Sequence, residues 1–576
     1  MPSEIATASK RGIGKTISLF FSIVILLSSV VYLNTIHNEF LWDDENMILR
    51  NPTLIDPWTA LTHTEGSALG RRPITNFSFG IDRWLFGIRP EGYHMTNIIL
   101  NAADAALFFF IALRIFRFLY GSTISGERQE IASGTASPRN DSPSVVGGDL
   151  SLREARSDLV FLWPAFFSAL IFGLHPIHTE AVASFLGRSD LLGSLFYFLG
   201  LLFYMKAVEA RRFIYYGLFF ASYILSLLSK EMAVTLPFIA ILYEMTFPYG
   251  LDIRRWFKER WRAVCIVLLI TVGPALFYIT SYGIVTPSTL DTQPYWGGNI
   301  LNTSLMMLTV IKEYLRLLFF PVKLCAWYVT DVPSVSEVAL SAGLLLSLIA
   351  LLIWGIRKNR IVFFSIACFF ISLIPVLNIV PIPGSMMAER WLYIPSMGFG
   401  LIAGYYIYKL RANPKGSVFA IPLLIILLGL YAARDVTRNE VWRTGYVFYT
   451  DMIRCCPKGY HGYYNLGNVF RDMGRYDEAA YYWQLALKIA PGHSMAHNNL
   501  GDYYLMKGRK DLALGEFLQA VRFDKRNVEA NYNLGMLFYE TGFKDEARKY
   551  LLVFLKIAPS DYEKQKDMVR RILESP

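Results

Sequence analysis

Charged residues are scarce in this sequence. Asp, Glu, Lys and Arg make up 18% of the 576 residues, whereas a soluble domain carries roughly 25%. So few charges cannot cover the surface of a soluble chain of this length, which excludes a soluble cytosolic enzyme. Hydrophobic residues, at 54%, also exclude a disordered chain. Much of the protein surface must therefore face lipid.

Cysteine and the usual signatures of nucleotide chemistry are also scarce or absent. The five cysteines contain no CxxC pair and no Cys/His spacing typical of a metal site, and the adjacent Cys455 and Cys456 make no disulfide framework. No P-loop is present, and no DxD motif lies in a soluble segment. A disulfide scaffold is excluded, and a nucleotide-phosphate donor is disfavoured.

Long apolar runs dominate instead, and a helix needs about 20 mostly apolar residues to cross a bilayer. The run 300–320 contains Lys312, Glu313 and Arg316, so we expect it to lie at the membrane interface. Residues 1–433 are therefore predicted to form an all-α polytopic bundle with about eleven spans. These spans are 16–36, 95–113, 160–174, 191–205, 213–229, 232–243, 263–290, 338–356, 361–380, 391–408 and 416–433.

Basic residues orient the predicted bundle. Clusters of Lys and Arg fall in alternate loops, which the positive-inside rule assigns to the cytoplasm, whereas the short outer loops hold single basic residues. A twelfth span at 300–320 would place the last two basic clusters outside. We therefore predict a cytoplasmic N-terminus and an extracytoplasmic C-terminal region. Residues 118–157, rich in Ser, Gly and charge, are predicted to form a disordered cytoplasmic loop.

A 34-residue period follows a predicted linker at 434–459. Gly467, Gly501 and Gly535 are 34 residues apart, and small and bulky residues recur with the same spacing. This is the tetratricopeptide pattern, in which small residues let paired helices cross closely. It predicts a C-terminal α-solenoid of three repeats, with capping helix and tail at 562–576. The repeats are expected at 460–493, 494–527 and 528–561.

The concave groove of such repeats would hold a peptide or a partner protein. Four asparagines on the first helices of the repeats are candidates for contacting a peptide backbone: Asn465, Asn468, Asn499 and Asn533. The alternative is that some of them only cap helices or bridge adjacent repeats.

Charged residues and histidines gather on the predicted outer face, where charge at a membrane is costly and marks candidate functional sites. Arg and Lys would neutralise a phosphate leaving group, and a carboxylate would take the proton of an incoming hydroxyl. The set therefore fits a phosphorylated substrate with a lipid tail. Its members are Asp43, Asp44, Arg71, Arg72, Arg83, His94, His178, Glu180, Arg188, Asp190, Lys230, Glu231, Glu389 and Arg390.

Each motif also has a structural interpretation. Glu389 and Arg390 would form a structural ion pair, and Lys230 and Glu231 would be an interfacial pair whose charged ends reach water. Asp104, in the middle of a predicted span, is expected to hydrogen-bond a neighbouring helix. Because these residues gather on one predicted face, we favour a functional site over separate structural roles. A transporter would place its charges near mid-membrane on broken helices, and this interpretation is the least favoured.

In this order, the outer-face motifs resemble the transmembrane and tetratricopeptide-repeat-containing protein O-mannosyltransferases, which belong to the GT-C superfamily. The resemblance extends over nearly the whole chain. It implies a polyprenyl-linked phosphate sugar as donor and action on the outer or lumenal face. The matching segments are FLWDDENMILRNP, GRRPITNFSFGIDRWLFGIRPEGYHMTNIIL, HPIHTEAVASFLGRSDLL, LSKEMAVTLP, YLRLLFFPVKLCAWY and AERWLYIPSMGFG.

The resemblance also implies roles. Asp43 and Asp44 match the family's acidic pair: one would be the general base for inverting displacement at the anomeric carbon, and the other would orient the acceptor or a metal. The arginines and Lys230 would hold the lipid phosphate. The other outer-face residues occupy matching positions without a defined role. The sequence departs from the family by having three repeats only, by matching 282–327 only at its end, and by its 118–157 loop.

We therefore predict a membrane glycosyltransferase that moves a hexose, mannose first, from a polyprenyl or dolichyl phosphate to Ser/Thr hydroxyls of proteins. The repeats would present the acceptor. The bacterial inner membrane is favoured and the endoplasmic reticulum stays open. No nucleic acid is expected as a partner, and a divalent cation is the one cofactor left open. The alternatives are a non-catalytic membrane scaffold and a GT-C enzyme with a lipid or glycan acceptor.

Overall fold

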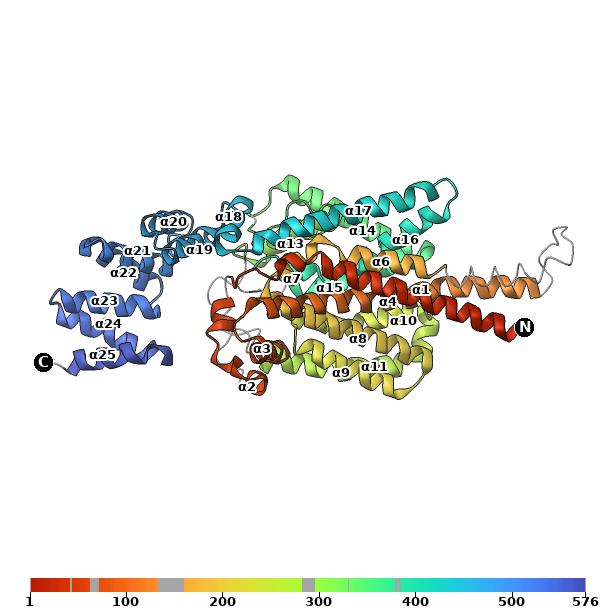
Figure 1. The fold of residues 1–576 in the computed structure, drawn as a ribbon, viewed down its shortest axis with the longest axis horizontal. Helices are drawn as coiled ribbons and strands as arrows, with labels where there is room; N and C mark the ends of the chain where they lie inside the picture. The colour runs from red at the N-terminus through yellow and green to blue at the C-terminus, as the bar shows by residue number, and fades with distance from the viewer. Residues whose placement is uncertain are drawn as a thin grey trace. The chain divides into compact units, whose positions relative to one another are not determined.

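The computed structural model describes residues 2–41, 44–62, 72–132, 160–281, 296–329, 331–378, 382 and 385–574. Throughout these ranges every regular element is helical, which confirms the all-α prediction. The chain divides into two compact units, Met1–Thr444 and Gly445–Pro576, and each is described by itself. Figure 1 shows the elements of both units.

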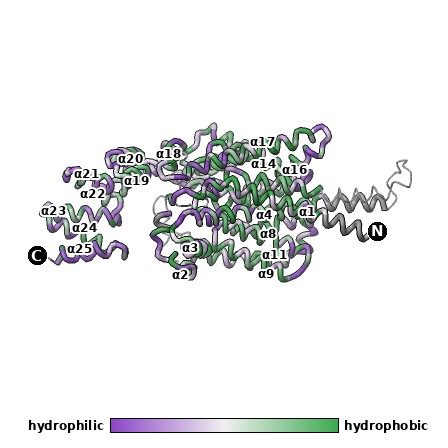
Figure 2. Tube along the Cα trace, in the orientation of Figure 1, coloured by the Kyte–Doolittle hydropathy of each residue, from purple (hydrophilic) through white to green (hydrophobic). Residues whose placement is uncertain are grey.

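The first unit is an integral membrane bundle. Six of its described helical segments are long and apolar enough to cross a membrane: Gly12–Thr35, Pro90–Tyr120, Phe185–Ala210, Ile253–Phe277, Val335–Lys358 and Ser417–Trp442. They contain or overlap α1 (Pro2–Val30), α4 (Pro90–Ala132), α8 (Arg188–Ala210), α11 (Ile253–Ser281), α14 (Val335–Lys358) and α17 (Ser417–Asn439). Hydrophobic residues dominate these helices in Figure 2.

Shorter helices complete the bundle, and the count of eleven spans stays a prediction beside the six long helices. The shorter helices are α6 (Leu162–Gly173), α9 (Phe213–Leu227), α10 (Leu236–Thr246), α13 (Ile300–Phe319), α15 (Arg360–Leu373) and α16 (Ser396–Ala412). Helices α4, α6, α8 and α16 pack together, and their aromatic side chains, among them Phe108, Phe172 and Phe198, fill the core. In contrast, only 11% of the apolar stretch of α14 is buried within the protein.

Helix α13 is amphipathic rather than uniformly apolar. Met306, Val310, Tyr314 and other apolar residues on one side are buried. Glu313 pairs with Arg316 away from that face, with both side chains partly exposed. A helix with this pattern suits an interface between protein and a wetter surface.

The predicted outer-face residues lie on α3 (Pro73–Phe86), on α4 and α8, and on or beside short helical turns between the longer helices. In the predicted first outer loop, η2 (Glu45–Leu49) and α2 (Pro57–Thr62) precede α3. Later in the chain the turns are η5 (Pro176–His178), α7 (Thr179–Ala183), η6 (Phe185–Gly187), η7 (Glu231–Thr235) and η9 (Glu389–Leu392). Segments of this kind bring side chains from distant parts of the sequence together.

The second unit consists of three helix pairs, preceded by α18 (Gly445–Cys455) and followed by α25 (Glu563–Glu574). The pairs are α19 (Tyr460–Asp472) with α20 (Tyr476–Ile489), α21 (Ser494–Met506) with α22 (Lys510–Phe523), and α23 (Val528–Glu540) with α24 (Lys544–Ile557). Glycine permits each pair to cross closely, because a Cβ at Gly467 would lie 2.6 Å from the Trp483 ring.

Two expected irregular segments are partly helical. Helix α4 continues to Ala132, so the start of the predicted loop 118–157 is helical, whereas 133–157 lies outside the described residues. The predicted linker 434–459 contains the end of α17 and the whole of α18. Helix α18 forms because Phe448, Tyr449 and Met452 make one apolar face, which is buried.

Candidate active site

A buried ion pair lies at the centre of the predicted outer-face residues. The Lys230 ammonium donates to Asp190 Oδ2 at 3.1 Å, and both side chains are about 4% exposed. Close packing of α8 makes the contact: a Cβ at Gly193 would lie 2.7 Å from Lys230 Cβ. The ammonium has three donors, and among the described residues it makes this one hydrogen bond.

Two arginines flank this pair, each held by its own carboxylate. Arg72 donates to Glu231 Oε1 at 2.8 Å and to Ser189 Oγ at 3.2 Å. Arg390 pairs with Glu180 through its guanidinium, and its backbone N–H donates to the same carboxylate at 3.0 Å. Arg390 also lies 3.9 Å from Asp190. Six residues from four distant segments thus form one charge cluster, defined as Arg72, Glu180, Asp190, Lys230, Glu231 and Arg390.

Burial and neighbouring charges act in opposite directions within this charge cluster. Burial lowers the pKa of Lys230, and the nearby Arg72 charge lowers it further, while Asp190 raises it. Burial would raise the pKa of Glu231, but the charges of Arg72 and Lys230 hold it at about 2. Glu231 therefore stays ionised at neutral pH, and the three cations lie close enough to affect one another. Such a set of preoriented donors is suited to an anion.

Of the acidic pair, the structure describes Asp44, whose backbone N–H donates to the Leu41 carbonyl oxygen at 3.1 Å. Asp44 is 3% exposed, and its Oδ2 accepts a hydrogen bond from the Leu41 backbone N–H at 2.8 Å. Asp43 and Arg71 lie outside the described residues. Arg83 donates to the carbonyl oxygens of Ile48 and Leu49 at 2.7 and 3.2 Å, so it fastens the turn after the acidic pair.

Arg188 is not in the charge cluster. It is fully buried and pairs with Asp82 at 2.8 Å. It also donates to Ser78 Oγ, to Asn97 Oδ1 and to the Tyr93 carbonyl oxygen, and it lies over the Phe79 ring. A guanidinium with this many partners joins α8 to α3 and α4 and has little capacity left for a phosphate.

Three buried histidines have their tautomers set by their partners. His94 Nε2 lies 3.2 Å from the Asn38 carbonyl oxygen, and His175 Nε2 lies 2.9 Å from the Leu318 carbonyl oxygen, so both Nε2 atoms carry the proton. His178 Nε2 lies 2.9 Å from Ser396 Oγ, whose own proton goes to the Tyr393 carbonyl oxygen. Burial lowers the pKa of His175 to about 4 and that of His178 well below its usual value. These histidines are therefore neutral and hold loops in place.

Glu389 faces away from the charge of its neighbour Arg390. It is fully buried, and its Oε1 accepts from the Cys325 backbone N–H and the Tyr328 hydroxyl, each at 2.5 Å. Burial raises the pKa of Glu389 to about 7, opposed by Arg438 and reinforced by Glu180. The carboxyl group therefore ties the segment after α13 to η9 and titrates near neutral pH.

Three of the four predicted groove asparagines bridge adjacent repeats. Asn468 Oδ1 accepts from Trp483 Nε1 and from Asn499 Nδ2, both at 3.0 Å. Asn533 donates to Asn498 at 3.1 Å and to Asp502 at 2.8 Å. Only Asn465 of the four makes no side-chain hydrogen bond with a described residue.

Sequence reasoning missed Asp82, Ser189 and Tyr328, which hold Arg188, Arg72 and Glu389. The one available signal was their place inside the same motifs.

Asp104 accepts from Ser194 Oγ at 2.6 Å, so it joins α4 to α8 as expected. Across the described ranges, no three His, Cys, Asp or Glu side chains are arranged for a metal ion. Because Asp43 lies outside those ranges, the divalent cation stays a prediction.

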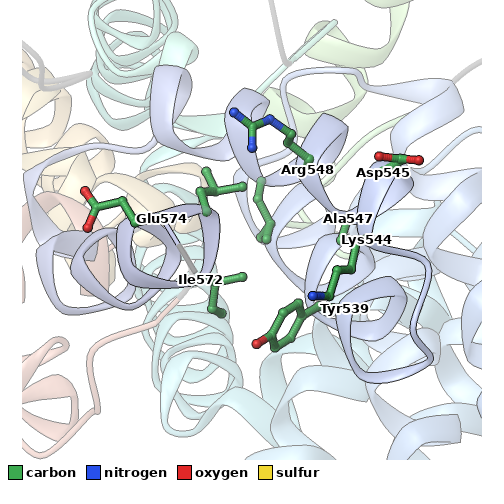
Figure 3. A pocket seen from close by; sticks show the side chains of 9 residues that line it. Tyr539, Lys544, Asp545, Ala547, Arg548, Ile572 and Glu574 are labelled. Atoms are coloured by element: carbon green, nitrogen blue, oxygen red, sulfur yellow. The ribbon is translucent and has the colours of Figure 1, made fainter. Parts of the chain in front are cut away.

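A separate pocket lies in the repeat unit, between α24 and α25. Tyr539, Lys544 and Arg548 line it on the repeat side, and Ile572 and Glu574 on the side of the capping helix (Figure 3). None of the predicted site residues lines this pocket.

Comparison with known proteins confirms the repeats and the family resemblance. Tetratricopeptide-repeat profiles match residues 461–526 and 528–561. A protein O-mannosyl-transferase of Caenorhabditis elegans is 26% identical over 489 residues, which cover 82% of this chain and 63% of that protein. Protein O-mannosyl-transferase Tmtc3 of Drosophila melanogaster is 26% identical over 540 residues, covering 83% of this chain and 56% of the relative.

A human relative gives the same picture. Protein O-mannosyl-transferase TMTC2 of Homo sapiens is 25% identical over 567 residues, covering 80% of this chain and 61% of the relative. The chain therefore spans about three fifths of the length of these relatives. Over about four fifths of its own length it is similar to proteins named as protein O-mannosyl-transferases.

Proposed function

We propose that this chain is a membrane glycosyltransferase that transfers a hexose, mannose first, from a polyprenyl-phosphate carrier to Ser or Thr hydroxyls of proteins. The observation that carries the proposal is the charge cluster, in which Arg72, Lys230 and Arg390 converge from three segments. A phosphate is the anion that such donors fit best. The similarity to named O-mannosyl-transferases supports the sugar and the acceptor.

The reaction would be an in-line displacement. The acceptor hydroxyl oxygen attacks the anomeric carbon, and the bond between that carbon and the phosphate oxygen breaks. Asp43 or Asp44 takes the hydroxyl proton. The polyprenyl phosphate leaves with its negative charge stabilised by Arg72, Lys230 and Arg390, which are already oriented by their carboxylates.

The proposal extends to topology and to the role of the repeats. We place eleven spans in the membrane, the N-terminus in the cytoplasm, and the charge cluster and the repeats on the extracytoplasmic face. The bacterial inner membrane is the favoured location. The groove of the repeats would bind the acceptor, with Asn465 as a contact to its backbone, because this side chain is not used in bridging repeats.

The test is sugar transfer by the purified full chain in lipid nanodiscs, with polyprenyl-phosphate mannose and a Ser/Thr-rich peptide. Asp43→Asn and Asp44→Asn are compared with Asp56→Asn, a matched control in the same loop. Asp56 accepts from the N–H groups of Trp58 and Thr59, and asparagine caps a helix about as well. Loss of transfer in either member of the acidic pair, with transfer kept in the control, supports the proposal.

Two alternatives give different results. A non-catalytic scaffold shows no transfer from any lipid-linked sugar and still binds partners through its repeats. An enzyme with a lipid or glycan acceptor transfers sugar to that acceptor even after residues 459–576 are deleted. A protein glycosyltransferase loses transfer to protein on this deletion and keeps it to a small hydroxyl acceptor.

A further inference from the structure

The last turns of α17 carry buried polar residues that neither the charge cluster nor the acidic pair explains. Asp435 and Asn439 are fully buried, whereas Leu423, Ile425 and Leu430 earlier in this helix are about half or more exposed. A polar group buried at the end of a membrane helix is costly unless its partners are specific. The partners of these two residues are therefore informative.

Asn439 holds the segment that leads into the acidic pair. Its Nδ2 donates to the Val31 carbonyl oxygen at 2.9 Å and to Asn34 Oδ1 at 2.7 Å. In return, Asn38 Nδ2 donates to the Asn439 carbonyl oxygen at 3.2 Å. The Glu39 backbone N–H donates to the Arg443 carbonyl oxygen at 3.0 Å. These bonds end four residues before Asp43.

Asp435 contacts the other half of the site. Its Oδ1 lies 3.2 Å from Thr179 Oγ1, and the Thr179 hydroxyl also donates to the Pro176 carbonyl oxygen at 2.9 Å. Thr179 is also fully buried and directly precedes Glu180, the carboxylate that holds Arg390. Residues four apart on a helix lie on one face, so Asp435 and Asn439 point to the same side of α17.

We infer that Asp435 and Asn439 form a brace that fixes the acidic-pair segment relative to the Glu180–Arg390 half of the charge cluster. This inference rests on the proposed function, since it treats these as the base and the phosphate sides of one reaction. Both are positioning residues, because their polar atoms are used within the protein. A displaced acidic pair would slow proton transfer, while the donor phosphate, held by the charge cluster, would bind as before.

The test compares Asn439→Ala and Asp435→Ala with Asn359→Ala in the full chain in nanodiscs. Asn359 is a matched control because its side chain caps α15 through the N–H groups of Ile361 and Val362, away from the outer-face turns. The first measurement is hydrogen exchange at the backbone amides of Glu39, Leu41 and Asp44. We expect exchange about tenfold faster in Asn439→Ala and unchanged in the control, because the alanine loses both hydrogen bonds that the Asn439 side chain donates.

The second measurement is steady-state transfer. In both brace variants we expect kcat to fall about tenfold, with the KM for the lipid-linked sugar changed by less than about twofold. In Asp44→Asn, adding Asn439→Ala should lower the residual rate no further, because residues that act through one another are not additive. Asn439→Asp is the conservative variant. It keeps the side-chain shape and loses the two donated bonds, so it should share the fall in kcat.

The outcomes separate the brace from the proposed function. If hydrogen exchange is faster in Asn439→Ala but the wild type transfers no sugar, the brace is supported and the proposed function is overturned. Wild-type transfer with unchanged exchange and unchanged kcat in Asn439→Ala overturns the brace and leaves the function standing. The brace is also overturned if the KM for the lipid-linked sugar rises as kcat falls in the brace variants. An equal fall of kcat in Asn359→Ala overturns it as well, because general destabilisation would then explain the result.

Discussion

Lys230 Nζ lies 3.1 Å from Asp190 Oδ2, although the two residues are 40 positions apart and both side chains are about 4% exposed. Two opposite charges withdrawn from water tolerate the loss of one partner poorly, because the other charge then stays buried alone. The pair is therefore both the centre of the charge cluster and a point of structural vulnerability.

Replacing one member of this pair should be far worse than replacing both. We expect Lys230→Met and Asp190→Asn each to lower the free energy of unfolding by about 3 kcal/mol, and the double variant to recover more than half. Reversible unfolding in detergent measures this. The exposed pair Arg255–Glu259 is the control, where Arg255→Met should change less than about 1 kcal/mol. Additive losses at Lys230 and Asp190 would contradict the prediction.

We expect binding of the lipid-linked sugar to depend on the planar guanidinium group of Arg390 and not only on its positive charge. Its backbone and side chain both contact Glu180, so Arg390→Lys keeps one charge and loses the planar contact. The KM for the lipid-linked sugar should rise at least about tenfold while the protein stays folded. Arg316→Lys, in the pair with Glu313, should leave KM unchanged. An unchanged KM in Arg390→Lys would remove this residue from the phosphate site.

Glu389 should make stability fall as pH rises. Burial raises its pKa to about 7 from 4.5, so the folded state holds the proton more tightly than the unfolded state does. The stabilisation is complete below about pH 4.5 and is lost as pH rises through about 7, on the order of 3 kcal/mol. In Glu389→Gln the loss between pH 5 and 8 should shrink. A melting-temperature series over pH tests this, with Glu313→Gln as control.

His493 should give the repeats the opposite dependence. Its Nδ1 accepts the Ala496 backbone N–H at 3.1 Å, which requires an unprotonated nitrogen. Burial, reinforced by His497, lowers its pKa to about 4 from 6.5. The stability contribution is present above about pH 6.5 and is lost as pH falls toward 4, on the order of 3 kcal/mol.

His493→Asn keeps a capping acceptor that does not titrate, so it should flatten this acid loss. Part of the loss should persist, because burial also lowers the pKa of His461 to about 4. Circular dichroism melts of the full chain at several pH values measure the effect. A loss of equal size in wild type and His493→Asn would show that the cap does not sense pH.

Asn465 and Asn499 should differ in what they affect. Asn499 donates to Asn468 in the preceding repeat, so Asn499→Ala should destabilise the repeats by about 1 kcal/mol. Asn465→Ala breaks no side-chain hydrogen bond to a described residue, and it should raise the KM for a peptide acceptor without lowering the melting temperature. Peptide kinetics and thermal melts on both variants decide. If Asn465→Ala and Asn499→Ala lowered the melting temperature equally, Asn465 would have a structural role.

The sequence predicted the members of the charge cluster better than their partners. Lys230, Glu231, Glu389 and Arg390 were adjacent pairs in sequence, yet each binds a residue from elsewhere, as Lys230 does with Asp190. Adjacent residues in a tight turn point in different directions, so neighbours in sequence are poor guides to ion pairs. The arginines were indistinguishable by type. Only the fold assigns Arg72 to the charge cluster and Arg188 to Asp82.

The repeats were predictable because their signal is local. A 34-residue period places glycine against a bulky side chain inside one helix pair, as at Gly467 and Trp483. Helix α18 was not predicted, since eleven residues with three apolar contacts form a weak periodic signal. Asp435 went unnoticed because it follows an apolar run and belongs to no motif, and only the packing of α17 reveals its partner Thr179.

The partners of Arg188 also bear on how the chain is made. Ser78, Asp82, Tyr93 and Asn97, which together satisfy its guanidinium, all precede it in the sequence. During synthesis the ribosome has therefore already released every group that neutralises this charge when α8 emerges. When α8 packs against α3 and α4, its buried arginine therefore finds all four of these partners already synthesised.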